Sequence, residues 1–193
     1  MIWAVILAAG KSRRMGTQKL LLPFGEATVV EAVVRTALDS LVEGAVAVVG
    51  ADGEAVRARL EPSGAGIAVN ERFAEGMLTS IQAGLRALPP EAEACVIMLG
   101  DQPFLPPPVV DIVIKGYRAS GRGIVIPVFR GRRGHPVLLD LKYRDEVLAF
   151  DPADGLRRLL RAHPDDIAEV ETDDPNILRD LDTPEDFAGL KKT

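Results

Sequence analysis

The strongest constraint on the fold is an alternation of short apolar runs with amphipathic segments along the chain. The apolar runs have strand length and occupy residues 3–9, 45–50, 66–70, 94–99, 123–129 and 167–172. Most are apolar throughout, as in strands that are covered on both faces of a sheet. Apolar residues recur every three or four positions, as in amphipathic helices, over residues 27–42, 76–88, 107–120, 154–163 and 183–192. This alternation predicts an α/β, Rossmann-like, three-layer fold with a mainly parallel, mixed sheet.

Length and composition favour one globular domain over residues 1–193, with 47% hydrophobic and 26% charged residues. The net charge of −5 argues against nucleic-acid binding, which usually leaves a basic footprint. The only cysteine, Cys95, lies in an apolar run and is interpreted as core filler. The apolar N-terminus has its basic residues after the run rather than before it, and is too short to span a bilayer. These features predict a cytoplasmic enzyme or binding protein with no membrane contact.

Ligands of parallel α/β sheets bind beyond the carboxyl ends of the strands, so the loops after strands are the informative ones. The first such loop contains Gly-Lys-Ser, but Val5 stands where a P-loop requires glycine. It also lacks a dinucleotide fingerprint, which argues against an oxidoreductase. Gly10 and Gly16 expose backbone N–H groups, and Arg14 and Lys19 add positive charge, so the loop predicts a triphosphate site. A solvated basic turn is the alternative.

Two aspartates are candidate metal ligands. Asp101 follows the apolar run 94–99, where one carboxylate suits Mg²⁺, which keeps water and phosphate oxygens as its other ligands. Asp182 is the candidate second ligand, and Asp180 is the alternative to it. Asp101 could instead be a turn residue that caps its own backbone. Asp180 and Asp182 could instead interact favourably with the dipole of the following helix.

Two further segments have the composition of binding loops. Arg130, Arg132 and Arg133 cluster around glycines before His135, either as an anion-attracting loop or as a solvated hairpin tip. His135 receives no catalytic role from the sequence. In residues 70–80, Asn70 ends a strand while Gly76 and Ser80 begin a helix, where they would line a nucleotide site.

These segments together resemble the MobA-like nucleotidyltransferases. LAAGKSRRMGTQK is similar to the family signature LAxGxSxRMGxxK, GDQPF to the metal-binding motif, NERFAEGMLTSI to the nucleotide-lining segment and LRDLDTPEDF to the closing motif. GHPV is similar to a stretch of the molybdenum cofactor cytidylyltransferases. The resemblance runs from residue 5 to residue 188, and implies the nucleotide-diphospho-sugar transferase type of fold.

The resemblance implies that CMP is transferred from CTP to the terminal phosphate of molybdopterin or the molybdenum cofactor, with release of pyrophosphate. Ala9-Gly10 resembles the cytidylyltransferases, whereas guanylyltransferases usually carry Gly-Gly there. The implied cofactor is Mg²⁺, with Mn²⁺ as an alternative, and a molybdoenzyme is an implied transient partner. A guanylyltransferase, transfer to another phosphorylated small molecule, and a non-catalytic nucleotide-binding protein that delivers cofactor remain the alternatives.

The resemblance also assigns roles to residues. The catalytic set is Arg14, Lys19 and Asp101, and the metal ligands are Asp101 and Asp182. The nucleotide-binding set is Leu7, Ala8, Ala9, Gly10, Ser12, Gly16, Asn70, Gly76 and Ser80. The acceptor-binding set is Arg132, Arg133, Gly134, His135 and Pro136.

Overall fold

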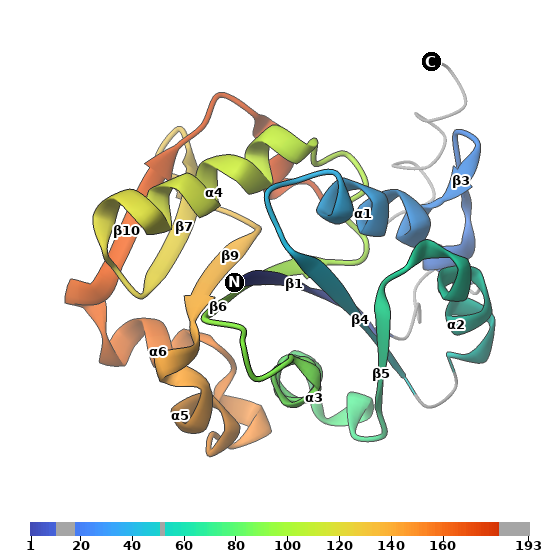
Figure 1. Ribbon diagram of the computed structural model, residues 1–193, viewed down its shortest axis with the longest axis horizontal. Helices are drawn as coiled ribbons and strands as arrows, with labels where there is room; N and C mark the ends of the chain where they lie inside the picture. Colours follow the sequence, from blue (N-terminus) through green and yellow to red (C-terminus); the bar gives the residue numbers. More distant parts are fainter. Residues whose placement is uncertain (11–17, 51–52, 182–193) are drawn as a thin grey trace.

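The computed structural model describes residues 1–10, 18–50 and 53–181. Within them, a three-layer α/β arrangement is built on one sheet (Figure 1). The sheet has the order β10-β7-β9-β6-β1-β4-β5, with β8 paired to β7. Its strands are β1 Ile2–Ala8, β4 Gly44–Gly50, β5 Gly66–Asn70, β6 Ala94–Leu99, β7 Ile124–Phe129, β8 Arg132–Arg133, β9 Val137–Asp140 and β10 Ile167–Glu171. A separate two-stranded pair consists of β2 Pro23–Phe24 and β3 Ala27–Thr28.

The pairing is mainly parallel, as predicted. Strand β1 lies between β6 and β4 and runs parallel to both, β4 is parallel to β5, and β7 is parallel to β10. Strand β9 runs antiparallel between β6 and β7 and makes the sheet mixed. The sequence prediction missed β9, because its four residues follow His135-Pro136 without a separate strand-length run.

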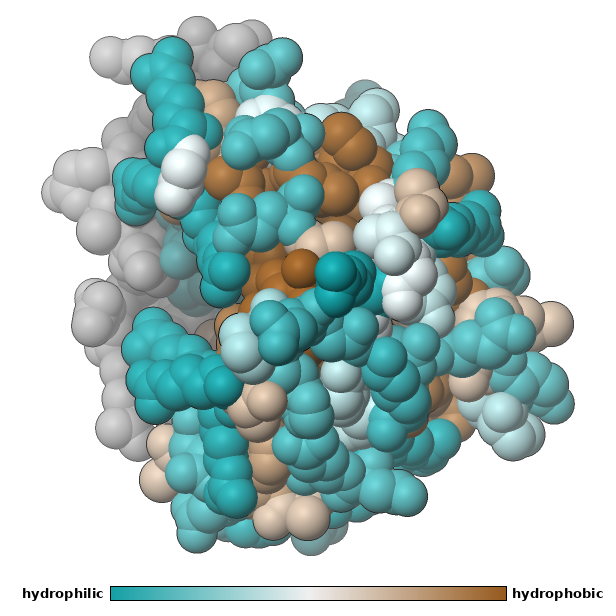
Figure 2. Space-filling view, turned by 90° about the vertical axis from the view of Figure 1, so that its left-hand side faces the viewer, coloured by the Kyte–Doolittle hydropathy of each residue, from teal (hydrophilic) through white to brown (hydrophobic). Residues whose placement is uncertain are grey.

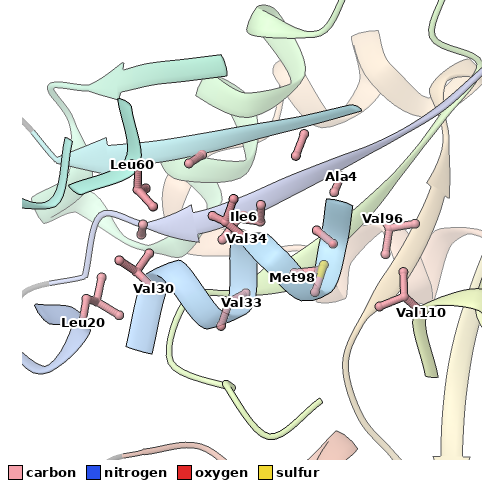
Figure 3. Close-up of a cluster of buried hydrophobic side chains, with 14 of the residues drawn as sticks. Ala4, Ile6, Leu20, Val30, Val33, Val34, Leu60, Val96, Met98 and Val110 are labelled. Carbon is pink, nitrogen blue, oxygen red and sulfur yellow. The ribbon is translucent and has the colours of Figure 1, made fainter. Parts of the chain in front are cut away.

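Helices cover both faces of the sheet (Figure 1). Helices α1 (Val29–Leu38), α2 (Glu54–Leu60) and α4 (Pro107–Ser120) contribute to one buried cluster, together with Ala4, Ile6 and Met98 from the strands (Figure 3). Helices α3 (Met77–Ala87), α5 (Arg144–Leu148) and α6 (Arg157–Ala162) contribute to the other. The two clusters use opposite faces of the same strands: β1 directs Ile6 into the first and Val5 into the second.

The helix predictions agree with the structure in place and differ in extent. The segment 27–42 becomes α1, which begins after Thr28, where a capping box joins this residue to Glu31. The segment 154–163 shortens to α6. Helix α2 was not predicted, because its apolar face is short and consists of Val56 and Leu60. The predicted helix 183–192 lies outside the described residues.

The edge strand β10 has exposed Glu169 and Glu171. Acidic side chains on an edge strand discourage pairing with another chain. The side of the molecule that holds β10 is largely hydrophilic, with hydrophobic patches between the polar groups (Figure 2).

The interpretation of Cys95 as core filler is confirmed, because the side chain is fully buried in β6 and unpaired with any other cysteine. Burial raises the pKa of the Cys95 thiol to about 12, which suppresses its thiolate form. No helix in the described part of the chain has the length and apolar character needed to cross a bilayer.

Candidate active site

The carboxyl ends of the parallel strands meet at one edge of the sheet and bring the predicted loops together. Leu7 of β1 pairs with Leu99 of β6, and Gly50 of β4 pairs with Asn70 of β5. The next residue after β6, Gly100, approaches β1 so closely that a Cβ atom would lie 2.8 Å from the Leu7 carbonyl oxygen. The loop that begins at Gly100 is therefore held directly against the end of β1.

Asp101 and Lys19 form an ion pair at this edge. The Lys19 ammonium lies 2.6 Å from Oδ2 of Asp101, although the two residues are 82 positions apart. Their side chains are 16% and 23% exposed, so the pair is open to a ligand without being fully solvated. The structure thus brings together two residues of the predicted catalytic set, and the interpretation of Asp101 as a turn residue alone does not account for this contact.

A C-terminal segment packs against the Asp101 loop. The Leu181 amide donates to the Asp101 carbonyl oxygen at 3.0 Å, and the Arg179 guanidinium lies 3.6 Å from the Phe104 ring centroid. Ile177, in the 3-10 helix Pro175–Leu178, is buried in a cluster with Leu105. These contacts place Asp180, the alternative second metal ligand, beside the Asp101 loop.

The Asp180 carboxylate accepts a hydrogen bond from a residue to which the sequence analysis assigned no role. The buried Gln102 side chain donates from Nε2 to Oδ1 of Asp180 at 2.6 Å, across 78 positions of sequence. The GDQPF motif marks the position of Gln102, but nothing local to it indicates a contact with Asp180.

The predicted acceptor loop lies beside the same segment. The His135 amide donates to the Ile177 carbonyl oxygen at 2.9 Å, and a Cβ atom on Gly134 would collide with that oxygen. The His135-Pro136 peptide bond is cis. Only glycine fits at position 134, because the acceptor loop and the C-terminal segment touch there through their backbones.

His135 is a neutral side chain in this environment. Burial lowers the pKa of its imidazole, and the carboxylates of Asp180 and Asp101 oppose that shift without reversing it. At neutral pH the ring therefore offers hydrogen bonding rather than positive charge.

A cavity of about 510 Å³ opens next to this loop. Three residues of the predicted acceptor set line it: Arg133, Gly134 and His135. The other walls, which the sequence analysis did not identify, are mostly apolar and come from α3, the strands and the region of α6: Met77, Leu78, Ile81, Ile97, Ile126, Val137, Ala153, Asp154, Gly155, Leu156, Arg157 and Leu160. Arg157 was missed because its amphipathic helix has no motif of its own.

The remaining acceptor residues lie near the cavity but do not line it. Arg132 is exposed on β8, and Pro136 is buried. Arg130 and Gly131 have positive φ values of 50° and 74° in the tight turn between β7 and β8. The turn is thus a hairpin tip, and Arg133 at its base forms an ion pair with Glu169 at 2.6 Å. The arginines therefore differ: Arg133 faces the cavity, while Arg130 and Arg132 lie at the tip.

The predicted nucleotide residues fall into two groups. Ala8, Ala9 and Gly10 line a narrow pocket with Gln18, Leu20, Gly53 and Val56, while Leu7 lies one residue before the end of β1. Asn70, in contrast, uses its side chain within the protein, since Nδ2 donates to Thr79 and Ser80 at 2.9 Å each and Oδ1 accepts from the Arg72 amide. Gly76 begins α3 with a φ of 125°, a conformation that favours glycine. Asn70, Ser80 and Gly76 thus shape the end of β5 and the start of α3.

Ser12, Arg14, Gly16 and Asp182 lie outside the described residues, and their predicted roles stay predictions. In the described part, no group of three or more His, Cys, Asp and Glu side chains is placed to hold a metal ion. Asp101 and Asp180 are the candidate metal carboxylates there, and the contacts of Gln102 and Leu181 link them. One or two carboxylates beside a phosphate site fit Mg²⁺ or Mn²⁺, which complete their coordination with water and phosphate oxygens.

The model of the MobA-like NTP transferase domain matches residues 4–167 of this chain. The protein belongs to this family. The MobA-like chain is 30% identical to the molybdenum cofactor cytidylyltransferase of Escherichia coli strain K12, over 97% of this chain and 94% of the relative. It is 33% identical to the nicotine blue oxidoreductase of Paenarthrobacter nicotinovorans, over 98% of this chain and 96% of the relative.

Solved structures confirm the fold type of this MobA-like protein. A Mycobacterium tuberculosis protein in complex with manganese is similar to it with a TM-score of 0.82 and 26% identity, covering 100% of this chain and 99% of that one. Nucleotidyltransferases of the nucleotide-diphospho-sugar transferase type share the three-layer arrangement, as the sequence resemblance implied.

Proposed function

We propose that this protein is an Mg²⁺-dependent cytidylyltransferase that transfers CMP from CTP to the terminal phosphate of molybdopterin or the molybdenum cofactor. The observation that carries the proposal is the Lys19–Asp101 pair at the carboxyl edge of the sheet, beside the loop after β1. It brings a cation for phosphate oxygens and a carboxylate for a metal ion to one place. The similarity to the Escherichia coli cytidylyltransferase and the Ala9-Gly10 pair favour CTP as the nucleotide.

The reaction requires positioning more than covalent chemistry from the protein. An oxygen of the acceptor phosphate attacks the α-phosphorus of CTP, the bond from that phosphorus to the bridging oxygen breaks, and pyrophosphate leaves. A bound Mg²⁺ supplies charge neutralisation at the phosphate oxygens. Asp101 would hold it, together with Asp182 or Asp180.

Lys19 changes partners during binding in this proposal. Its ammonium neutralises Asp101 in the described structure. With CTP and a divalent cation bound, Asp101 would hold the cation, and the Lys19 ammonium would bind the phosphates together with Arg14. Lys19 then stabilises the charge that develops on the leaving pyrophosphate.

The backbone at Ala8, Ala9 and Gly10 would contact the nucleotide at its surface, whereas the cavity of about 510 Å³ would bind the acceptor. The cavity's apolar walls suit the body of a heterocyclic ring system, and Arg133 and Arg157 add positive charge for anionic groups. The neutral His135 imidazole lies between this cavity and the two aspartates. We therefore assign it to hydrogen bonding with the acceptor.

Pyrophosphate release tests the proposal directly. The four nucleoside triphosphates are each supplied with Mg²⁺, with and without purified molybdopterin. Release with CTP only when molybdopterin is present is the expected result. A clear preference for GTP would indicate a guanylyltransferase instead of a cytidylyltransferase. CTP binding without pyrophosphate release would favour a non-catalytic protein that delivers cofactor.

The oxidoreductase relative provides a second candidate function, supported by 33% identity over nearly the full chain. It is tested by oxidation of NADH and NADPH in the presence of a quinone-like dye acceptor. We expect no turnover, because the loop after β1 has no glycine between Gly10 and Gly16 to form a dinucleotide fingerprint. Reduced-nicotinamide oxidation without pyrophosphate release would refute the transferase proposal.

A further inference from the structure

Gln102 follows Asp101 and is buried to a degree that is unusual for glutamine, with 2% of its surface exposed. Its amide is only half satisfied. Nε2 donates to Oδ1 of Asp180, whereas Oε1 is fully buried and has no hydrogen-bond partner in the part of the chain that the structure describes.

This arrangement contributes little to folding stability. The cost of a buried polar atom without a partner is similar in size to the gain from a hydrogen bond to a charged group, so the two largely cancel. An apolar side chain of the same volume would make the protein about equally stable. The amide at position 102 therefore points to a role in the site rather than in the core.

The partner of Gln102 defines that role. The backbone next to Asp180 is fixed by the hydrogen bond from Leu181 to Asp101 and by the stacking of Arg179 on Phe104. Asp180 accepts from Gln102, the neighbour of Asp101, and Leu181, the neighbour of Asp180, donates to the Asp101 carbonyl oxygen, so the two aspartates belong to one region. The hydrogen bond from the Gln102 amide restricts the side-chain torsion of Asp180 and keeps its carboxylate beside the Asp101 loop.

We propose that Gln102 is a positioning residue that holds the Asp180 carboxylate in place for the divalent cation bound by Asp101. This role rests on the proposed metal-dependent transfer. The Gln102 amide donates to Oδ1 of Asp180 and fixes the orientation in which that carboxylate would meet the cation. Because the glutamine is neutral, it orients Asp180 without taking away the negative charge that attracts the metal.

The test measures Mn²⁺ binding by electron paramagnetic resonance, with the full-length protein and saturating CTP. Gln102→Met preserves volume and removes the donor. We expect an approximately 10-fold weaker Mn²⁺ affinity, equivalent to about 1.4 kcal/mol. We also expect a matching rise in the metal concentration for half-maximal pyrophosphate release, and a melting temperature close to that of the wild type.

A double-mutant cycle separates positioning from a general packing effect. Asp180→Ala should also weaken Mn²⁺ binding, and adding Gln102→Met to it should cause no further loss. Equal Mn²⁺ affinity in Gln102→Met and wild type would overturn the role. An undiminished effect of Gln102→Met in the Asp180→Ala background would overturn it as well.

Gln82 provides a matched control, because it is also a glutamine with 2% of its surface exposed. Its amide donates to the backbone carbonyls of Val147 and Phe150 and not to an aspartate. Gln82→Met should lower the melting temperature and leave Mn²⁺ affinity unchanged. Wild-type protein that binds no Mn²⁺ with CTP would refute the proposed function together with this role. Normal wild-type binding that Gln102→Met leaves intact would refute the role of Gln102 alone.

Discussion

Replacing Asp101 with asparagine removes one negative charge from the candidate site while preserving the size of the side chain and an oxygen that faces Lys19. The ion pair that it breaks is partly solvated, with side chains 16% and 23% exposed, and such pairs contribute about 1 kcal/mol to stability. In a chain of 193 residues this lowers the melting temperature by about 2–4 °C. The Asp101→Asn protein should therefore be folded and assayable at 25 °C.

Catalysis should suffer much more than folding. Losing the carboxylate that holds the metal ion should lower kcat/KM at least about 100-fold, or about 2.7 kcal/mol of transition-state stabilisation. A coupled pyrophosphate assay over a range of Mg²⁺ concentrations, beside a thermal melt, separates the two effects. Asp111→Asn is the matched control, because Asp111 is also half-buried and hydrogen-bonded, to the Leu41 amide at 2.8 Å, on α4. Folded Asp101→Asn protein with near-wild-type pyrophosphate release would refute the metal role.

Three further predictions concern single residues. Lys19→Met should lower kcat by about 100-fold with a much smaller effect on CTP binding measured by calorimetry; equal losses in both would contradict a role at the leaving group. Gly134→Ala should destabilise the protein by at least about 1 kcal/mol in urea unfolding, because its Cβ meets the Ile177 carbonyl, and an unchanged unfolding midpoint would disprove that contact. Burial raises the pKa of Asp166, but hydrogen bonds from Lys142, Tyr143 and the Gly123 backbone together outweigh it and lower the pKa to about 2. Asp166 therefore stabilises the fold above its unfolded pKa near 3.8, and this contribution is lost as the pH falls towards 2. Melting curves between pH 6 and pH 2 should show a smaller acid-induced decrease for Asp166→Asn than for wild type; identical curves would contradict this.

The sequence was sufficient for the elements whose signals are local. Strand β1 and helix α1 followed from apolar spacing, although the capping box that fixes the start of α1 after Thr28 was found only in the structure. Asp101 could be singled out because a carboxylate directly after a buried strand lies at the ligand-binding edge wherever that strand sits in a parallel sheet. These inferences need only the neighbouring residues and the general geometry of the fold class.

Contacts between distant parts of the chain needed the tertiary structure. Nothing local to Lys19 or Asp101 says that their charged groups meet, and nothing local to Gln102 indicates Asp180. The insertion of β9 between β6 and β7 brings His135 to the end of β6, where burial makes its imidazole neutral.

What the sequence by itself determined was the succession of the longer strands and helices, and which loops carry charge at the strand ends, because backbone periodicity and turn chemistry act over a few residues. What only the tertiary structure decided was which of those charges pair, which polar groups are buried, and which walls enclose the cavity. Pairing, desolvation and enclosure depend on distances in space, and packing of the two helix layers against the sheet sets those distances.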